Sequence, residues 1–349
     1  MSRWQYFLRR VLLSIPVVIF GTTITFALIR LGPLDPVSAI LGTQYTPGAA
    51  AQIRSNLGLD QPLWQQYFSF MWDLFTFNLG QSWVIASGTP AYELILVYAP
   101  RTIWLGFWSV LIALFVGIPL GFYAGLNPNT PSDYFASFGG IVWRAMPNFW
   151  LAIMLVTALS QTGQWTNGVF NWTTWIVDTN VVTPPALAFL NNPFQKFLAD
   201  PSGWFNSFLK ATKQIAPAAL VLGSASMGNE MRIGRTAVLE TINANYIETA
   251  RAKGVPGRSL VWKHIFRNAL IPLVPIITGE AFLLIGGSVF VETVFAINGL
   301  GWLFFNAAIN GDLPLIGTLM YMFILLLVGT NILQDFLYTV IDPRVGYDG

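Results

Sequence analysis

Residues 245–272 read NYIETARAKGVPGRSLVWKHIFRNALIP, a basic and polar stretch inside a chain that is otherwise strongly apolar. Apolar segments long enough to cross a membrane stand on both sides of it, so the stretch has to lie in water. Lysine and arginine accumulate on the cytoplasmic side of membrane proteins. We therefore expect this stretch to be a cytoplasmic surface on which a soluble partner docks.

The composition of the chain indicates a protein embedded in lipid. Of its 349 residues 54% are hydrophobic and 10% are charged, whereas a soluble domain has about 25% charged residues. The sequence has no cysteine and one histidine, His264, which excludes disulfides, thiolate chemistry and a histidine-based metal site. His264 lies among basic residues, and we expect a surface contact there. We expect no cofactor and no nucleic-acid partner.

The apolar periodicity predicts an all-α membrane protein with about six transmembrane helices. The first segment is longer than the core of a cleaved signal peptide, and we expect it to be retained as a span. The fourth is the weakest, because glycine, asparagine and glutamate dilute it. The six predicted segments are 9–30, 102–126, 135–160, 214–233, 270–293 and 314–340.

The distribution of basic residues predicts that both chain ends lie in the cytoplasm. With that orientation eleven of the 18 lysines and arginines fall inside and six fall outside, while Arg144 lies within the third segment. Two long segments, 31–101 and 161–213, are then external. The predicted organisation has three parts: a first helix with an external segment (1–94), a transmembrane domain (95–340) whose cytoplasmic loop is at about 234–269, and a cytoplasmic tail (341–349).

The cytoplasmic loop is predicted to form two helices with a bend between them. Residues from about Arg235 to Lys253 favour a helix, which Gly254 can end in the left-handed conformation, and Pro256 blocks continuation. Ser259 can then cap a second short helix. Small side chains leave the bend narrow enough to enter a groove on a partner. An ordinary solvated loop, whose charges only set topology, is the alternative.

The series Glu248-x-Ala250-x-x-x-Gly254 resembles the E-A-A-x-x-x-G signature of ABC importer permeases. Thr249 stands where the signature has alanine, and the closing Leu-Pro is replaced by the later Ile271-Pro272. Both departures resemble the peptide and nickel branch of that family. RRVLLSIPVVIFGTTITFALIRLGPLDP, LGLDQPLWQQY with NLGQS, VFVETVFAINGLGWLFFNAAINGDLPLI and ILQDFLYTVIDPRVGY also resemble this branch. The resemblance covers nearly the whole chain except about 161–213.

This resemblance implies a type I importer permease in the cytoplasmic membrane that moves di- or oligopeptides or a related small solute. It implies a second homologous permease, two cytoplasmic ATP-binding subunits and an external solute-binding protein as partners. No lysine in the chain follows a glycine, so no Gly-Lys-Ser/Thr phosphate loop exists and ATP must be bound by another polypeptide. The chain itself is therefore not expected to be an enzyme. The resemblance assigns docking and coupling to Glu248, Ala250, Arg251, Lys253 and Gly254.

Polar groups within the apolar segments are candidates for the path of the solute, because charge facing lipid is costly. We expect Glu292 and Asp335 near segment ends, in interfacial positions, whereas Arg144 and Glu280 lie deeper. The deeper groups could border the path, or they could pair with each other or with a second permease. The translocation-path candidates are Arg144, Asn148 and Glu280.

Several alternatives stay open at this point. An ion-driven secondary transporter would need no ATPase, but inverted repeats and matching buried acids are not clear in the sequence. An intramembrane enzyme would need a nucleophile and base or paired carboxylates in a recognisable motif. Within the family, nickel, glutathione and sugar are alternative solutes.

Overall fold

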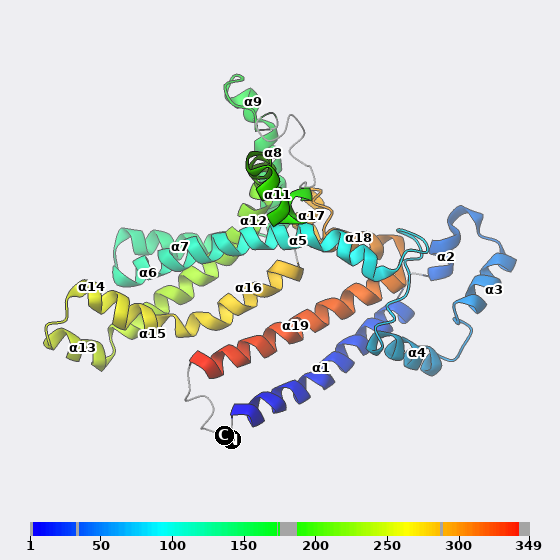
Figure 1. Ribbon diagram of the computed structural model, residues 1–349, viewed down its shortest axis with the longest axis horizontal. Coiled ribbons are helices and arrows are strands. Elements are labelled where there is room, and N and C mark those ends of the chain that lie inside the picture. Colours follow the sequence, from blue (N-terminus) through cyan, green and yellow to red (C-terminus); the bar gives the residue numbers. More distant parts are fainter. Residues whose placement is uncertain (1–2, 33–34, 173, 175–186, 287–288, 342–349) are drawn as a thin grey trace.

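The computed structural model describes residues 3–32, 35–172, 174, 187–286 and 289–341, and these residues form helices and no named strand (Figure 1). The all-helical prediction is confirmed for this part of the chain. The predicted tail 341–349 lies outside the described residues, apart from Ile341.

The body of the molecule is built from long helices that run roughly side by side (Figure 1). α1 packs along α19, α16 lies between α19 and α5, and α12 packs against α5 on the other side. α12 is a single helix of 42 residues. The bounds of the long helices are α1 Arg3–Leu31, α5 Ala91–Ile112, α12 Pro201–Ile242, α16 Val274–Gly286 and α19 Leu313–Ile341.

Four described helical stretches are long and apolar enough to cross a membrane. α7 (Pro131–Ala145) and α8 (Asn148–Ser160), which meet at a sharp bend beside Pro147, could together form a fifth. α12, which contains the predicted segment 214–233, is not among them. The four stretches are Phe7–Leu31, Ala91–Leu126, Gly257–Glu280 and Leu313–Leu337.

α5 continues through the π-helical turn η2 (Ala113–Gly117) into α6 (Ile118–Leu126). Gly117, Gly121 and Gly125 repeat at every fourth position of this stretch. A Cβ atom at Gly121 would lie 2.4 Å from the Met231 carbonyl oxygen, so only glycine allows α6 to approach α12 this closely.

The shorter helices gather mainly at the two ends of the long axis (Figure 1). At one end lie α2 (Pro36–Leu41), α3 (Pro47–Asn56) and α4 (Leu63–Phe75). At the other end lie α13 Asn245–Ala252, α14 Gly257–Ser259, the π-helical turn η4 Leu260–Phe266 and α15 Arg267–Ala269. The remaining short elements are η1 Gly42–Gln44, α9 Thr162–Trp165, η3 Ala188–Leu190, α11 Pro193–Ala199, η5 Ile271–Leu273, α17 Val289–Val294 and α18 Leu300–Asn310.

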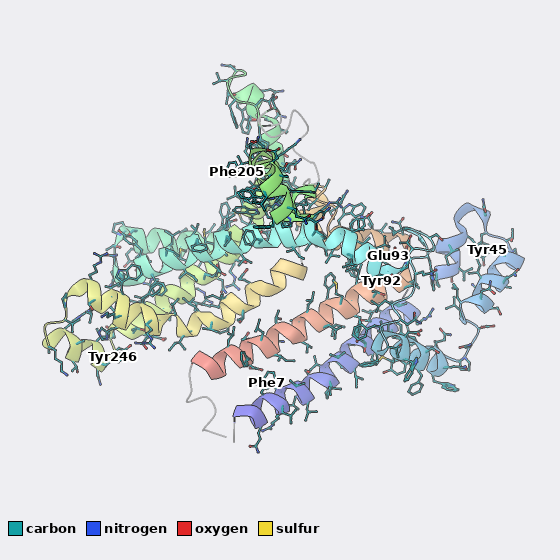
Figure 2. The ribbon with its side chains drawn as sticks, viewed as in Figure 1. Phe7, Tyr45, Tyr92, Glu93, Phe205 and Tyr246 are labelled. Atoms are coloured by element: carbon teal, nitrogen blue, oxygen red, sulfur yellow. The ribbon has the colours of Figure 1, made fainter. Side chains whose placement is uncertain are left out.

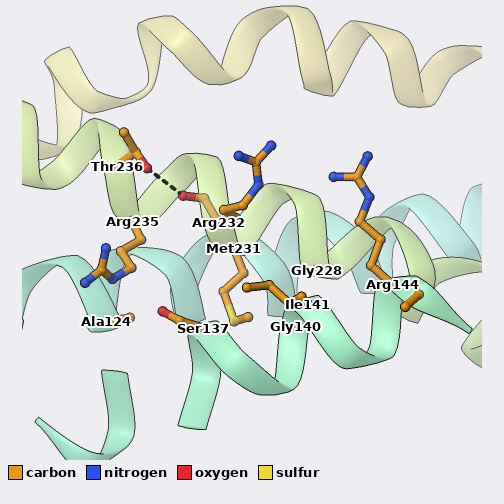
Figure 3. Close-up of a pocket in the computed structure, with 11 residues that line it drawn as sticks. Ala124, Ser137, Gly140, Ile141, Arg144, Gly228, Met231, Arg232, Arg235 and Thr236 are labelled. Atoms are coloured by element: carbon orange, nitrogen blue, oxygen red, sulfur yellow. Dashed lines mark hydrogen bonds between the residues drawn. The ribbon is translucent and has the colours of Figure 1, made fainter. Parts of the chain in front are cut away.

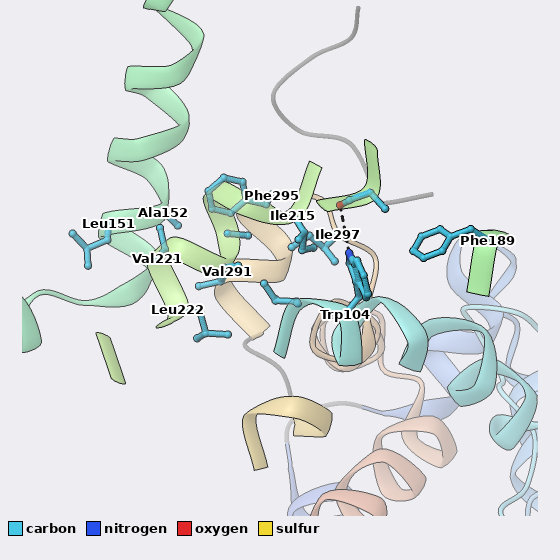
Figure 4. Packing of buried hydrophobic residues seen from close by; sticks show 14 residues of the cluster. Trp104, Leu151, Ala152, Phe189, Ile215, Val221, Leu222, Val291, Phe295 and Ile297 are labelled. Carbon is cyan, nitrogen blue, oxygen red and sulfur yellow. Dashed lines mark hydrogen bonds between the residues drawn. The ribbon is translucent and has the colours of Figure 1, made fainter. Parts of the chain in front are cut away.

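One apolar cluster joins α5, α8, α12 and α17 (Figure 4). Trp104 packs edge-to-face against Phe189, and its indole N–H donates to the Ala211 carbonyl oxygen at 3.4 Å. By contrast, large apolar side chains stand exposed along the outer faces of the long helices (Figure 2). Phe20 on α1 is 68% exposed and Phe115 on η2 is 73% exposed. Such faces are stable when lipid covers them.

Two details of the cytoplasmic loop differ from the sequence-based prediction. The helix predicted over Arg235–Lys253 is broken: α12 ends at Ile242, and α13 begins at Asn245. The prediction that Ser259 caps the next helix is wrong, because Pro256 (φ −57°, ψ 140°) already turns the chain into α14 at Gly257. Proline favours such a position because its ring fixes φ.

Candidate functional site

The bend after α13 is a Schellman motif. Gly254 has φ +73°, its N–H donates to the Arg251 carbonyl at 2.9 Å, and the Val255 N–H donates to the Ala250 carbonyl at 3.2 Å. Glycine reaches positive φ without the steric cost that a Cβ atom brings. The left-handed helix end predicted at Gly254 is therefore confirmed.

α13 buries one face and exposes the other. Ile247 is fully buried and Ala250 is 9% exposed, and both pack on a cluster formed with α6 and α12. Glu248, Arg251 and Lys253 are exposed. The i, i+3 spacing of the two buried residues defines one buried face, and the charged side chains flank it or follow the last turn.

The exposed charged side chains of the bend form no ion pair within the described part of the chain. Glu248, Arg251 and Lys253 are absent from the ion pairs within 4.0 Å that the described residues form, which join Arg10 to Asp335, Arg54 to Asp35 and Arg235 to Asp133. Tyr246, 45% exposed, adds an aromatic ring at the same end (Figure 2). The bend is thus an outward-facing charged surface on a packed base.

The basic residues after the bend continue this surface. Arg258, Lys263 and Arg267 are exposed on α14, η4 and α15, while Leu260 and Ile265 are buried beneath them. His264 is half-buried and its carbonyl accepts from the Asn268 side chain at 2.7 Å. No described carboxylate forms an ion pair with these residues.

The structure separates the two deep charges that the sequence placed in the membrane. The Arg144 guanidinium, at the end of α7, donates to the Asn229 side-chain oxygen on α12 at 3.0 Å. Glu280 on α16 is 9% exposed and is an electrostatic neighbour of Glu230 on α12, which is fully buried. Asn148 is half-buried in the first turn of α8. Arg144 and Glu280 form no ion pair with each other in the described chain.

α7 and α12 are also joined by an ion pair that sequence reasoning did not single out. Arg235 donates from Nε to Asp133 Oδ1 at 2.5 Å and from its terminal nitrogen to Asp133 Oδ2 at 2.8 Å. These hydrogen bonds raise the pKa of Arg235 further above its usual range. Asp133 is fully buried. The sequence did carry one signal for Asp133, the helix start at Thr130-Pro131, because acidic residues favour the first turn of a helix.

A groove of about 440 Å³ opens between α7 and α12 beside this ion pair (Figure 3). Glycines from both helices lie at its base, and arginines line it. The lining includes Ser137, Gly140, Ile141, Arg144, Gly228, Met231, Arg232 and Arg235.

At the other end of the molecule two buried carboxylates accept hydrogen bonds at both of their oxygens. Asp312 accepts from the Ser82 hydroxyl at 2.5 Å and from the backbone N–H groups of Trp83, Val84 and Ile85 at 3.0–3.1 Å. Glu292, expected at an interface, is instead fully buried and accepts from the Thr102 hydroxyl at 2.9 Å. Sequence reasoning missed both networks, since their partners are about 190 to 230 residues apart.

Glu292 also accepts from the Trp302 N–H at 3.0 Å, and the Leu300 N–H donates to Thr102 at 2.7 Å. This network holds the start of α18 against α5. Asp335, the other residue expected near a segment end, pairs with Arg10 on α1 at 3.4 Å.

Comparison with known proteins places the chain among transport proteins. The family described as "Binding-protein-dependent transport system inner membrane component" matches residues 117–347, and its N-terminal companion matches residues 3–88. The oligopeptide transport system permease protein AppB of Bacillus subtilis is 32% identical over 342 residues, covering 98% of this chain and 99% of AppB. The dipeptide transport system permease protein DppB of Escherichia coli is 33% identical over 349 residues, covering 98% of each chain. A putative peptide transport system permease protein of Brucella suis is 35% identical over 342 residues, again 98% of each.

Proposed function

This chain belongs to the family of binding-protein-dependent transport system inner membrane components, and we propose that it is the permease subunit of an ATP-driven importer of short peptides. Peptide as the solute is supported by the names of the relatives, which are oligopeptide, dipeptide and peptide permeases. The sequence alternatives of nickel, glutathione or sugar are outcomes of the same transport assay.

The proposed assembly has three kinds of partner besides lipid: a second homologous permease, two ATP-binding subunits and an external solute-binding protein. Two observations support it. The family is described as dependent on a binding protein. The chain has no Gly-Lys-Ser/Thr phosphate loop, so the energy of ATP has to reach it through contact with another polypeptide.

The observation that carries the proposal is the outward-facing bend at Gly254. A surface that transmits force must be rigid and accessible, and the Schellman motif with its packed base is both. We assign contact with an ATP-binding subunit to Glu248, Arg251, Lys253 and Gly254. Ala250, which is buried, supports the bend from below. Motion of the ATP-binding subunits would then move α12 and α16 as rigid elements.

The proposed topology has six spans with both chain ends in the cytoplasm, α12 supplying the fourth and α7 with α8 the third. It is supported by the excess of basic residues on the α13 side and by the position of α13–α15 at the opposite end of the long axis from α2–α4 (Figure 1).

Replacing Gly254 with tryptophan tests the docking role. We expect ATP-driven uptake of dialanine by the reconstituted transporter to fall by more than about tenfold. The bulk of the new side chain and the backbone strain at φ +73° should weaken contact with the partner by at least about 1.4 kcal/mol. The matched control is Gly48→Trp on α3, where a Cβ atom also meets open space. Uptake by Gly254→Trp equal to that of the control would remove the docking role, provided that both variants assemble.

Labelling from outside tests the topology, and the absence of native cysteine makes single-cysteine variants clean. Lys253 and Asp60 are both exposed, on the docking bend and on the external segment respectively. In intact cells a membrane-impermeant maleimide should label Asp60→Cys and leave Lys253→Cys unlabelled until the cells are opened. The reverse pattern would invert the topology and place the bend beyond the reach of ATP-binding subunits.

A further inference from the structure

The groove between α7 and α12 combines arginine side chains with an apolar wall. Its volume of about 440 Å³ lies within the range of about 300–1,000 Å³ that is usual for small-molecule sites. Figure 3 shows the guanidinium groups of Arg144 and Arg232 extending to the same side, whereas the side chains of Ile141 and Met231 lie lower, between α7 and α12.

Glycine shapes the base of the groove. A Cβ atom at Gly228 would lie 3.0 Å from the Gly140 carbonyl oxygen, and one at Gly140 would lie 2.5 Å from the end of the Met231 side chain. The two backbones therefore approach closely at this level, and the longer side chains on either side form walls around a hollow.

The groove carries more positive charge than the described residues neutralise. Arg235 is neutralised by Asp133 through two hydrogen bonds. Within the described part of the chain Arg144 bonds to a neutral amide, Asn229, and Arg232 is exposed with its side chain in none of the ion pairs. An arginine in a membrane segment needs a counter-charge or water, because charge facing hydrocarbon is costly.

The depth of Arg144 distinguishes the possible sources of that counter-charge. Arg144 lies eleven residues beyond Asp133 on α7, which at 1.5 Å per residue is about 16 Å. With the Asp133–Arg235 pair at the cytoplasmic boundary of the proposed topology, Arg144 stands near the middle of a hydrocarbon core of about 30 Å. A lipid phosphate stays in the headgroup layer, so at the depth of Arg144 an anion that enters the groove from the transport path is favoured. Arg232 lies three residues before Arg235 on α12, about 4.5 Å from the level of the boundary pair, where either source of anion can reach it.

We propose that this groove binds the terminal carboxylate of a peptide in transit, with Arg144 and Arg232 as the binding residues. This inference rests on the proposed peptide import. Guanidinium groups match a carboxylate in charge and in planar geometry, and such charge-assisted hydrogen bonds are about twice as strong as neutral ones. Asn229 orients Arg144, and the wall formed by Ile141 and Met231 accepts apolar side chains of varied size.

The test compares dialanine with its C-terminal amide, which lacks the carboxylate charge, in ATP-driven uptake by the reconstituted transporter. For Arg144→Gln and Arg232→Gln the KM of the free acid should rise by about tenfold, the effect of losing one charged hydrogen bond. The KM of the amide should change less than about twofold. Arg144→Lys, which keeps the charge, should recover part of the loss, and Arg9→Gln, an exposed arginine on α1, is the matched control.

Two outcomes of the uptake assay would overturn the site. One is an equal rise in KM for acid and amide. The other is a loss of uptake that appears only in liposomes rich in anionic phosphatidylglycerol, which would assign the arginines to lipid. Equilibrium binding of radiolabelled dialanine to the purified transporter separates the site from the proposed function. If the wild type imports no peptide but binds the acid better than the amide, and Arg144→Gln abolishes that preference, peptide import is wrong and the carboxylate site stands. If binding shows no preference for the acid, the site is wrong.

Discussion

Asp312 and Glu230 are both fully buried acidic residues, yet their surroundings are opposite. Asp312, at the end where α18 meets α19, accepts four hydrogen bonds from the segment 82–85. Glu230, on α12 beside α16, accepts no backbone N–H or hydroxyl hydrogen bond from the described residues, and its polar neighbour is the carboxyl group of Glu280. Burial alone therefore does not tell what an acidic residue does in this protein.

This difference shows which part of the molecule is held in place by a buried carboxylate. A carboxylate that satisfies three backbone N–H groups and a hydroxyl holds two distant segments in one arrangement. Glu230 supplies no such constraint to a backbone segment, and a neutral group of the same shape costs little there. The hydrogen bonds of Asp312 therefore fix the end where α18 meets α19, whereas Glu230 does not fix α12 against α16 in this way.

The largest effect that would sharpen this contrast is expected for Asp312→Ala. Its four donors lose their acceptor, and each donor that stays buried costs about 1–3 kcal/mol. We expect the free energy of unfolding to fall by about 3–5 kcal/mol, measured by thermal unfolding of the purified protein in detergent with tryptophan fluorescence.

Asp60→Ala on the exposed external segment is the control, with an expected change within about 0.5 kcal/mol. If Asp312→Ala changed the free energy of unfolding no more than the control does, the contrast between Asp312 and Glu230 would be lost.

A smaller and more direct comparison is the same substitution at two buried positions, Glu292→Gln and Glu230→Gln. Glu292 accepts at both oxygens, from Thr102 and from Trp302, and an amide can accept at only one of its two positions. We expect Glu292→Gln to destabilise the protein by about 1–3 kcal/mol. Glu230→Gln should change stability by less than about 1 kcal/mol, because it keeps the shape and an amide can still hydrogen-bond to the neighbouring carboxyl group of Glu280.

Both variants are measured in the same unfolding assay, so each serves as the control for the other. Equal destabilisation by the two would show that Glu230 has a partner as important as those of Glu292, and the contrast would fail.

The bend at Gly254 could be predicted from the sequence because all of its determinants are local. The Gly254 N–H donates to Arg251 and the Val255 N–H donates to Ala250, which ends α13, and Pro256 follows two residues after Gly254. The contact between Arg144 and Asn229, 85 residues apart, could not be predicted in this way. The same holds for the neighbouring carboxyl groups of Glu230 and Glu280, which come from different helices.

Gly228 and Asn229 show how one signal carried two meanings. In the sequence they weaken the predicted fourth segment by lowering its apolar character. In the structure Gly228 allows α7 to approach α12, and Asn229 is the partner of Arg144. The same two residues therefore weaken the predicted fourth segment and help to form the groove.

Composition and local motifs were enough to predict that the chain is helical and lipid-embedded and that its basic loop bends at Gly254. These properties follow from composition, from the length of apolar segments and from the conformational freedom of one residue, all of which act over short distances along the chain. Which polar groups meet depended on how the helices pack. Helix packing sets those distances, and it satisfies Asp312, gives Arg144 an amide, and places Glu230 beside Glu280.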